Sequence, residues 1–436
     1  MVADHRRTSG DDKKYMNEFI PYGRQCIDED DIQAVIAVLQ SDWLTQGPHI
    51  EEFEKALANY CGAKYAVAVS SGTAALHLAC LAAEIGPGDE VITSPITFAA
   101  SANCALYVGA KPVFVDIDPD TICLDPDKLE EYLTDKDKTQ KTVPVPKPKV
   151  VIPVHFGGHP CDMETIRKIA DEHNLIVIED ACHALGSEWK DTRGRWLKAG
   201  SCSHSEMTVF SFHPVKHITT GEGGAILTNN SELYERLLLL RNHGITKNSD
   251  KFINKDMAYT YVDKLSSQSN LPLQINPWYY EMQMPGYNYR ITDIQSALGL
   301  AQLGKVDGFI KRRREIVSEY NNMFSGIKGI SIPEERPHAR SSYHLYVLQV
   351  DFERIGKTRT QVMNELKEKG IGTQVHYIPV HFQPYYQKMY GYKQGDYPFA
   401  EAYYSRALSI PLYPSLKKHE IEKVIQSIIS SISEEK

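Results

Sequence analysis

Short apolar segments alternate with stretches of helical spacing through the first 180 residues of this chain. The apolar segments span residues 65–69, 90–93, 112–115, 150–154 and 175–178. Strands that alternate with helices in this way favour a mostly parallel, doubly wound sheet, whose ligands bind at the carboxyl ends of the strands. The last segment contains four consecutive apolar β-formers, which predicts a strand buried on both faces. The sequence therefore predicts an α/β fold.

The bulk composition limits the function classes. The chain has 436 residues, is 42% hydrophobic and carries a net charge of -8, so a large core and a globular fold are expected. The longest basic run, residues 311–314, falls within an amphipathic helical pattern and indicates a solvated helix face, not a nucleic-acid site. No apolar run reaches about 18 residues, and residues 1–17 are polar, so we expect a cytoplasmic protein with a disordered leader and no membrane contact.

The cysteines and histidines do not indicate a metal site. The eight cysteines are scattered, without a C-x-x-C pair or the clustering of a disulfide framework. Residues 202–204 and 159–161 each combine a cysteine with a histidine, but neither has the paired spacing of structural zinc. No metal is predicted.

Lys216 lies on a constrained loop between two predicted strands. Residues 207–212 form an apolar β-forming segment, Pro214 ends it, and a glycine-rich turn leads to a second apolar segment at 225–227. A lysine on such a loop can be desolvated, which lowers its pKa and makes its amine a nucleophile for a carbonyl group. From this segment alone, a solvated loop lysine explains the pattern equally well.

Two further segments follow predicted strands and carry side chains suited to a ligand. Ser71, Gly72 and Thr73 lie between a strand and a helix, where free backbone N–H groups and the helix dipole can hold a phosphate. Serine and threonine are also ordinary helix N-caps, and that alternative stays open. Phe98 follows the next strand and could stack on a planar ring, although burial in the core is the default.

The strand at 175–178 ends in Glu179, Asp180 and, shortly after, His183. A charge at the end of a buried strand is costly unless a cation meets it. If Lys216 binds a pyridine aldehyde, Asp180 can pair with the ring nitrogen, and His183 can lie beside the ring. A structural ion pair and a core histidine explain these two residues singly. Together with the phosphate turn and the lysine loop, they fit one ligand, pyridoxal 5'-phosphate (PLP).

These segments resemble the signature motifs of the DegT-type sugar-nucleotide aminotransferases. The resemblance rests on residues 71–73, 97–98, 179–183, 210–216 and 221–224 and extends from about residue 20 to the C-terminus. It implies the PLP-dependent aminotransferase fold type I: a large PLP-binding α/β domain (18–285) with a mostly parallel sheet of the seven-stranded type, and a smaller C-terminal α+β domain (286–436). In the last part we expect helices at 293–303, 308–323, 360–369 and 419–432, and strands at 342–350 and 371–378.

The resemblance also implies roles for single residues. It makes Lys216 the cofactor-binding lysine, places Asp180 at the pyridine nitrogen and His183 beside the ring, and stacks Phe98 on the other face. The phosphate is expected to be held by Gly72, Thr73, Ser211 and, across the interface of a homodimer with shared active sites, Asn288.

Four further segments, 43–48, 201–207, 277–282 and 375–381, resemble the pseudaminic-acid branch of the family. This branch implies L-glutamate as amino donor and amination at C4 of a UDP-linked 4-keto-6-deoxy-N-acetylhexosamine. The residues implied in binding the sugar nucleotide are Tyr22, Thr45, Gln46, Ser71, Asn288, His376 and Tyr377. Residues 136–149 and 248–272 form longer segments than the family pattern leads us to expect.

Three other functions make different demands on the sequence. A PLP-dependent sugar dehydratase of the same fold would carry histidine at the position of Lys216. A nicotinamide-dependent dehydrogenase would need G-x-G-x-x-G after the first strand, where this chain has Ser70-Ser71-Gly72-Thr73. A non-catalytic PLP-binding regulatory homologue would lack the lysine or the Asp-His pair, and a family member with another sugar epimer, nucleotide or a C3 position stays open.

Overall fold

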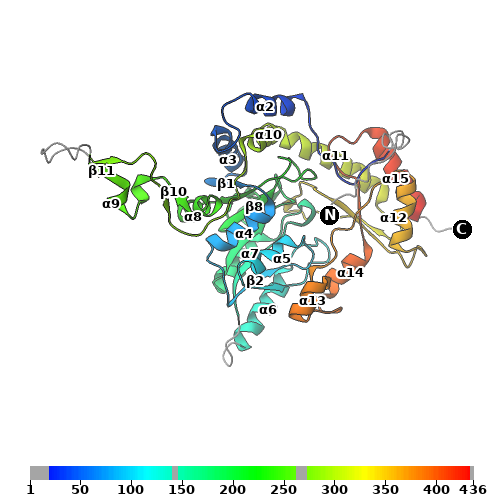
Figure 1. Ribbon diagram of the computed structural model, residues 1–436. Helices are drawn as coiled ribbons and strands as arrows, with labels where there is room; N and C mark the ends of the chain where they lie inside the picture. Colours follow the sequence, from blue (N-terminus) through cyan, green and yellow to red (C-terminus); the bar gives the residue numbers. More distant parts are fainter. Residues whose placement is uncertain (1–18, 140–145, 262–272, 433–436) are drawn as a thin grey trace.

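A computed structural model describes residues 19–139, 146–261 and 273–432 of the chain (Figure 1). The predicted leader, residues 1–17, lies outside the described residues, as does part of each longer segment at 136–149 and 248–272. Within the described part, no helix combines the length and the apolar composition that crossing a membrane requires.

A seven-stranded sheet forms the centre of the fold. Its strands are β1 (Tyr65–Val69), β2 (Asp89–Thr93), β3 (Lys111–Phe114), β4 (Lys147–Ile152), β5 (Ile176–Asp180), β8 (Met207–Ser211) and β9 (Gly224–Thr228), in the order β1-β9-β8-β5-β4-β2-β3. The pairs from β8 to β3 are parallel, and β9 is antiparallel to both β8 and β1. The predicted mostly parallel sheet is confirmed.

Both faces of this sheet are covered. Neighbouring residues of β5, Val177 and Ile178, are fully buried in two different apolar clusters, which confirms that this strand is buried on both sides. The covering helices include α4 (Gly72–Ala82), α5 (Ala100–Tyr107), α6 (Pro126–Thr139), α7 (Met163–Glu172) and α8 (Ser231–Arg241). Several helices start at a capping side chain, for example Ser71 before α4 and Asp162 before α7, because such oxygens satisfy free N–H groups of the first turn.

Two N-terminal helices, α2 (Glu29–Leu39) and α3 (Pro48–Cys61), pack against α10 (Asp293–Leu303). Beyond α10, the strands β14 (Ile330–Ser331), β16 (Tyr346–Val350) and β17 (Ala407–Ile410) form a separate sheet. It shares an apolar cluster with α11 (Val306–Phe324), α12 (Arg359–Glu368) and α15 (Lys418–Ile432). These elements agree with the α+β character expected of the C-terminal part, and the boundary at 285/286 stays a prediction.

One predicted strand is wrong. Residues 371–378 make only isolated bridges, Ile371 to Ile20 and Gln374 to Ser409, and the strand beside β16 is β17 instead. The apolar side chains of 371–378 misled the prediction, because this segment only bridges to its neighbours at Ile371 and Gln374 and then contacts His183 through Tyr377. Two helices follow it, α13 (Pro384–Tyr390) and α14 (Pro398–Arg406).

An arm projects from the body of the molecule (Figure 1). It contains β10 (Ile245–Thr246), α9 (Lys255–Ala258), β11 (Tyr259–Tyr261), β12 (Leu273–Ile275) and β13 (Glu281–Met282). Glu281 at its base accepts hydrogen bonds from the backbone N–H groups of Ile253 and Asn254. The arm exposes large apolar side chains, among them Trp278, Tyr280 and Met282. The remaining short strands, β6 (Glu188–Lys190), β7 (Trp196–Lys198) and β15 (Ala339–Arg340), form a three-stranded sheet.

Candidate active site

Lys216 lies in the turn that joins β8 to β9, at the carboxyl end of the parallel strands. Its backbone N–H donates to His213 O at 2.8 Å, and Thr220 N–H donates back to Phe212 O at 3.0 Å, which closes the turn. Burial lowers the pKa of Lys216, against the opposing effects of the neighbouring Cys182 and Asp180. Lys216 therefore loses its proton more easily than an exposed lysine does, as expected of a nucleophilic lysine.

Asp180 ends β5 beside this turn and is held from several sides. Its Oδ2 accepts a hydrogen bond from Ser101 Oγ at 2.6 Å, and its Oδ1 accepts one from Cys182 N at 3.1 Å. Only 5% of the residue is exposed. A buried carboxylate with these donors is fixed in orientation, because each oxygen has its own partner.

His183 follows on the same loop and has one defined tautomer. Gly157 N–H donates to its Nδ1 at 3.4 Å, so Nε2 carries the proton and donates to the Tyr377 hydroxyl at 3.0 Å. Burial, helped by the charge of Lys216, lowers the pKa of His183 well below its usual value. The imidazole is therefore neutral, and it joins the large sheet to the segment around Tyr377.

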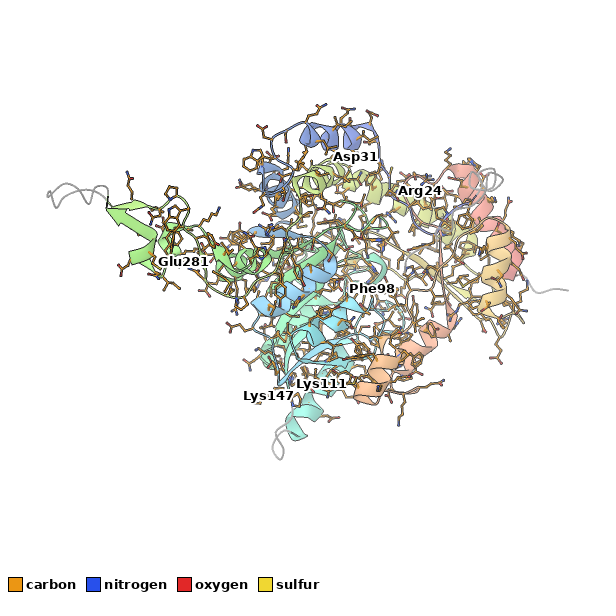
Figure 2. The ribbon with its side chains drawn as sticks, viewed as in Figure 1. Arg24, Asp31, Phe98, Lys111, Lys147 and Glu281 are labelled. Atoms are coloured by element: carbon orange, nitrogen blue, oxygen red, sulfur yellow. The ribbon has the colours of Figure 1, made fainter. Side chains whose placement is uncertain are left out.

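Phe98 is not a core residue. It follows β2 and is 56% exposed, so the default expectation of burial is wrong, although Figure 2 shows it near the middle of the molecule. Its ring centroid lies 6.2 Å from that of Tyr377. An exposed aromatic face next to the segment that binds His183 is available to a planar ring.

Gly72 and Ser211 adjoin each other at the start of α4. A Cβ atom on Gly72 would lie 2.9 Å from Ser211 Cβ, so only glycine fits here without displacement. Ser71 Oγ caps the helix by accepting from Ala74 N at 3.1 Å, which supports the N-cap alternative for this residue. Thr73 lies in the first helical turn. The close approach of the two segments leaves a small cradle at a helix N-terminus, which suits a phosphate.

The predicted substrate residues occupy three places. Tyr22 and His376 have ring centroids 5.4 Å apart, and His376 Nδ1 bonds to Ser409 Oγ at 2.7 Å. Burial and the charge of Lys216 lower the pKa of His376 to about 3. Asn288 is exposed, next to Tyr289, whose carbonyl accepts from Ser70 N at 2.8 Å.

Thr45 and Gln46 lie on an exposed loop before α3. Within the described residues, neither side chain bonds to Lys216, Asp180 or His183. Asp293 anchors the loop: its carboxylate accepts from Gly47 N at 2.7 Å and from His49 N at 3.0 Å.

Sequence reasoning missed Ser101, Gly157 and His344. The ring of His344 lies 4.5 Å from that of His183, because Arg313 donates to the carbonyls of Tyr343 and His344 and fixes that segment. No sequence pattern joins positions so far apart. The contact of Ser101 with Thr97 also depends on how the chain enters α5, because Thr97 precedes the helix.

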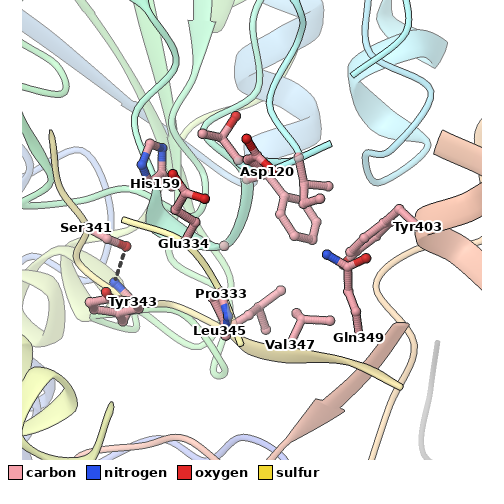
Figure 3. A pocket seen from close by; sticks show the side chains of 14 residues that line it. Asp120, His159, Pro333, Glu334, Ser341, Tyr343, Leu345, Val347, Gln349 and Tyr403 are labelled. Carbon is pink, nitrogen blue, oxygen red and sulfur yellow. Dashed lines mark hydrogen bonds between the residues drawn. The ribbon is translucent and has the colours of Figure 1, made fainter. Parts of the chain in front are cut away.

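A small pocket of about 40 Å³ adjoins the site, and Lys216 is not among its lining residues (Figure 3). Its lining includes Phe156, Gly157, Tyr343, Leu345 and Tyr403. Gly157, which donates to His183, is thus shared between the pocket wall and the site.

Comparison with known proteins agrees with this geometry. The model of the DegT/DnrJ/EryC1/StrS aminotransferase family matches residues 25–429. The spore coat polysaccharide biosynthesis protein SpsC of Bacillus subtilis is 44% identical over 413 residues, 94% of this chain and 97% of SpsC. Among solved structures, Helicobacter pylori PseC, an aminotransferase involved in the biosynthesis of pseudoaminic acid, is 30% identical with a TM-score of 0.80, over 95% of this chain and 99% of PseC. Spr1654 of Streptococcus pneumoniae, solved in its PLP form, is 30% identical with a TM-score of 0.79, over 95% and 98% of the two chains.

The fold and the site define a PLP-dependent aminotransferase of fold type I. The chain belongs to the DegT/DnrJ/EryC1/StrS family of sugar aminotransferases. This membership excludes the dehydrogenase that the sequence left as an alternative.

The residues present fit PLP. The cradle at Gly72 and Ser211 would be filled by a single Cβ atom, which leaves room there for phosphate oxygens only while residue 72 is glycine. The exposed ring of Phe98, the buried carboxylate of Asp180 and the amine of Lys216 provide a stacking face, an anion and a nucleophile for the other parts of the cofactor.

Proposed function

We propose that this aminotransferase moves an amino group from L-glutamate to C4 of UDP-2-acetamido-2,6-dideoxy-β-L-arabino-hexos-4-ulose. The product is UDP-4-amino-4,6-dideoxy-N-acetyl-β-L-altrosamine, for the biosynthesis of pseudaminic acid. The likeness to PseC over nearly the whole of both chains supports this substrate, together with the segments 43–48, 201–207, 277–282 and 375–381.

The observation that carries the proposed catalytic site is the grouping of Lys216, Asp180 and His183 at the carboxyl ends of β5 and β8. Asp180 ends β5 opposite Val209 of the neighbouring strand β8, the turn that carries Lys216 follows β8, and His183 lies three positions after Asp180, so the three residues share one edge of the sheet. Their roles are proposals: Lys216 is the nucleophile and proton carrier, Asp180 pairs with the ring nitrogen, and His183 lies beside the ring.

When bound, PLP supplies a protonated pyridine ring that accepts the negative charge left when a substrate C–H bond breaks. Lys216 Nζ removes the proton from Cα of glutamate in the first half of the reaction. In the second half it delivers a proton to C4 of the sugar. Asp180 would pair with the ring nitrogen, and the neutral His183, which donates from Nε2 to Tyr377, would lie beside the ring.

Further residues would bind the phosphate and the sugar nucleotide. Gly72, Thr73 and Ser211 hold the cofactor phosphate in this proposal, with Asn288 reaching it from the partner in a homodimer. The exposure of Asn288 and of the apolar side chains on the arm supports a partner chain. Tyr22, Thr45, Gln46, Ser71, His376 and Tyr377 are the proposed contacts of the sugar nucleotide. A cytoplasmic location is part of the same proposal.

A second candidate is amination of another nucleotide sugar, because the relative with 44% identity is named for spore coat polysaccharide biosynthesis. A coupled assay separates the two. Activity with the L-arabino 4-keto sugar and at least tenfold less with its D-xylo epimer supports the pseudaminic-acid substrate, and the reverse preference overturns it.

Lys216→Ala tests the catalytic assignment. The variant should lose turnover and the visible absorbance that PLP shows when bound to a lysine, since no other amine replaces Lys216 in the turn. Gly308→Ala, in an exposed turn of α11 with open space around it, is the matched control and should keep both. Full activity of Lys216→Ala would overturn the assignment.

A further inference from the structure

A chain of buried hydroxyl groups leads from α5 to Asp180. Thr97 Oγ1 lies 2.7 Å from Ser101 Oγ, and Ser101 Oγ lies 2.6 Å from Asp180 Oδ2. All three residues are almost fully buried, with Ser101 only 1% exposed. Bulk water therefore does not compete for these two hydrogen bonds.

The direction of these hydrogen bonds follows from chemistry. An ionised carboxylate only accepts, so the single proton of the Ser101 hydroxyl goes to Asp180 Oδ2. The Ser101 oxygen is then the acceptor, and Thr97 is the donor. Thr97 thus polarises Ser101, which strengthens its bond to the carboxylate.

The same turn also carries Phe98. Ser101 N–H donates to Phe98 O at 3.2 Å, so the backbone that presents the exposed Phe98 ring fixes the start of the helix that presents Ser101. One turn therefore contacts the proposed cofactor site from two directions, at the ring face through Phe98 and at Asp180 through Ser101.

We propose that Ser101 is a positioning residue for the transamination and acts through Asp180. The inference rests on the proposed function, in which Asp180 pairs with the pyridine nitrogen. Ser101 occupies Oδ2, and Cys182 N–H approaches Oδ1, so the carboxylate cannot rotate about its Cβ–Cγ bond. Ser101 thereby holds the carboxylate in the one orientation in which it can face the ring nitrogen of the cofactor.

Without Ser101, one oxygen of a buried carboxylate loses its donor. The carboxylate can then turn away from its present orientation, so it pairs less well with a protonated pyridine ring. Both the affinity for PLP and the protonation of its ring nitrogen should fall together.

The test compares Ser101→Ala and Thr97→Val with a matched control, Thr93→Val. Thr93 is also a buried hydroxyl residue, but its Oγ1 donates to the carbonyl of Ile152 at 2.8 Å and does not touch Asp180. Two readouts are used: PLP affinity of the cofactor-free protein by fluorescence titration, and the ¹⁵N shift of bound PLP labelled at its ring nitrogen.

Ser101→Ala should weaken PLP binding by about tenfold or more and move the ¹⁵N signal toward the unprotonated position. Thr97→Val should do the same to a smaller degree, and Thr93→Val should change neither readout. If Ser101→Ala binds PLP within about twofold of the wild-type affinity and leaves the ¹⁵N shift unchanged, the inference is overturned. If the wild-type protein itself binds PLP without using Lys216, the proposed function fails instead, so the two failures are distinguishable.

Discussion

Tyr377 and His183 are 194 positions apart in the sequence, and their side chains meet at 3.0 Å. The contact fixes the His183 ring from the side opposite to Gly157, whose N–H approaches the other ring nitrogen. Tyr377 Oη therefore sets where the neutral imidazole points, while its own ring lies 6.2 Å from that of Phe98.

Replacing Tyr377 by Phe removes the acceptor of the His183 Nε2 proton. We expect kcat/KM to fall about tenfold, or ~1.4 kcal/mol, because one buried hydrogen bond at the site is lost. The control is Tyr346→Phe, which loses a hydrogen bond from its hydroxyl to Asn321 Oδ1 at 2.7 Å in the small sheet and should keep the wild-type rate. If Tyr377→Phe kept the same kcat/KM as the control Tyr346→Phe, Tyr377 would not position His183.

Asp293→Asn tests the loop that carries Thr45 and Gln46. Each carboxylate oxygen of Asp293 accepts one backbone N–H, from Gly47 and from His49. In asparagine one of these oxygens becomes an NH₂ group, which cannot accept, so one hydrogen bond is lost and the loop should loosen. We expect the KM for the sugar nucleotide to rise about fivefold, while the glutamate half-reaction, followed by PLP absorbance, stays at the wild-type rate.

The buried carboxylate of Asp31, which contacts the other end of α10, provides the control for that experiment (Figure 2). It bonds to Gln302 Nε2 and Lys305 Nζ, both at 2.7 Å, and holds α2 on α10 without touching the loop. Asp31→Asn should lower thermal stability but leave both KM values unchanged. A rise of the glutamate KM in Asp293→Asn would contradict a role confined to the sugar nucleotide.

Gly72→Ala should weaken PLP binding. The added methyl group would lie 2.9 Å from Ser211 Cβ, so one of the two segments of the cradle must move. An increase of about tenfold or more in the PLP dissociation constant is expected, with a smaller effect on the stability of the cofactor-free protein. Unchanged affinity would place the phosphate elsewhere.

The buried histidines should make the cofactor-free protein less stable in acid. Burial lowers the pKa values of His183, His217, His344 and His376, so the folded state does not take up the protons that the unfolded state binds near pH 6.5. Stability is thus highest above pH 6.5 and is lost as the pH falls below it.

His344→Phe isolates one of these groups, because His344 Nδ1 is buried without a hydrogen-bond partner in the described structure. Between pH 8 and pH 5, the loss of unfolding free energy measured in urea should be smaller than in the wild type by about 2 kcal/mol. An identical pH dependence of the two proteins would mean that His344 is protonated in the folded state.

Local patterns predicted the main elements of the large sheet. Alternation of apolar and helical segments was sufficient for β1, β2, β4 and β5, and the motif around Lys216 predicted the turn between β8 and β9. The strand at 371–378 was wrong because apolar side chains there serve contacts between distant segments instead of a sheet. The default expectation that Phe98 is buried in the core was wrong, because the surrounding tertiary structure decides whether an aromatic side chain is covered.

The sequence by itself determined the identities at the strand ends: a lysine, an aspartate and a histidine next to a Ser-Gly-Thr turn. It determined these because strand, turn and helix signals act over a few residues. Only the tertiary structure decided that Ser101 donates to Asp180 and that Tyr377 accepts from His183. Such contacts depend on how the chain packs across tens to hundreds of positions, where no local spacing rule applies, and they fix the charge and orientation of the groups that the sequence supplies.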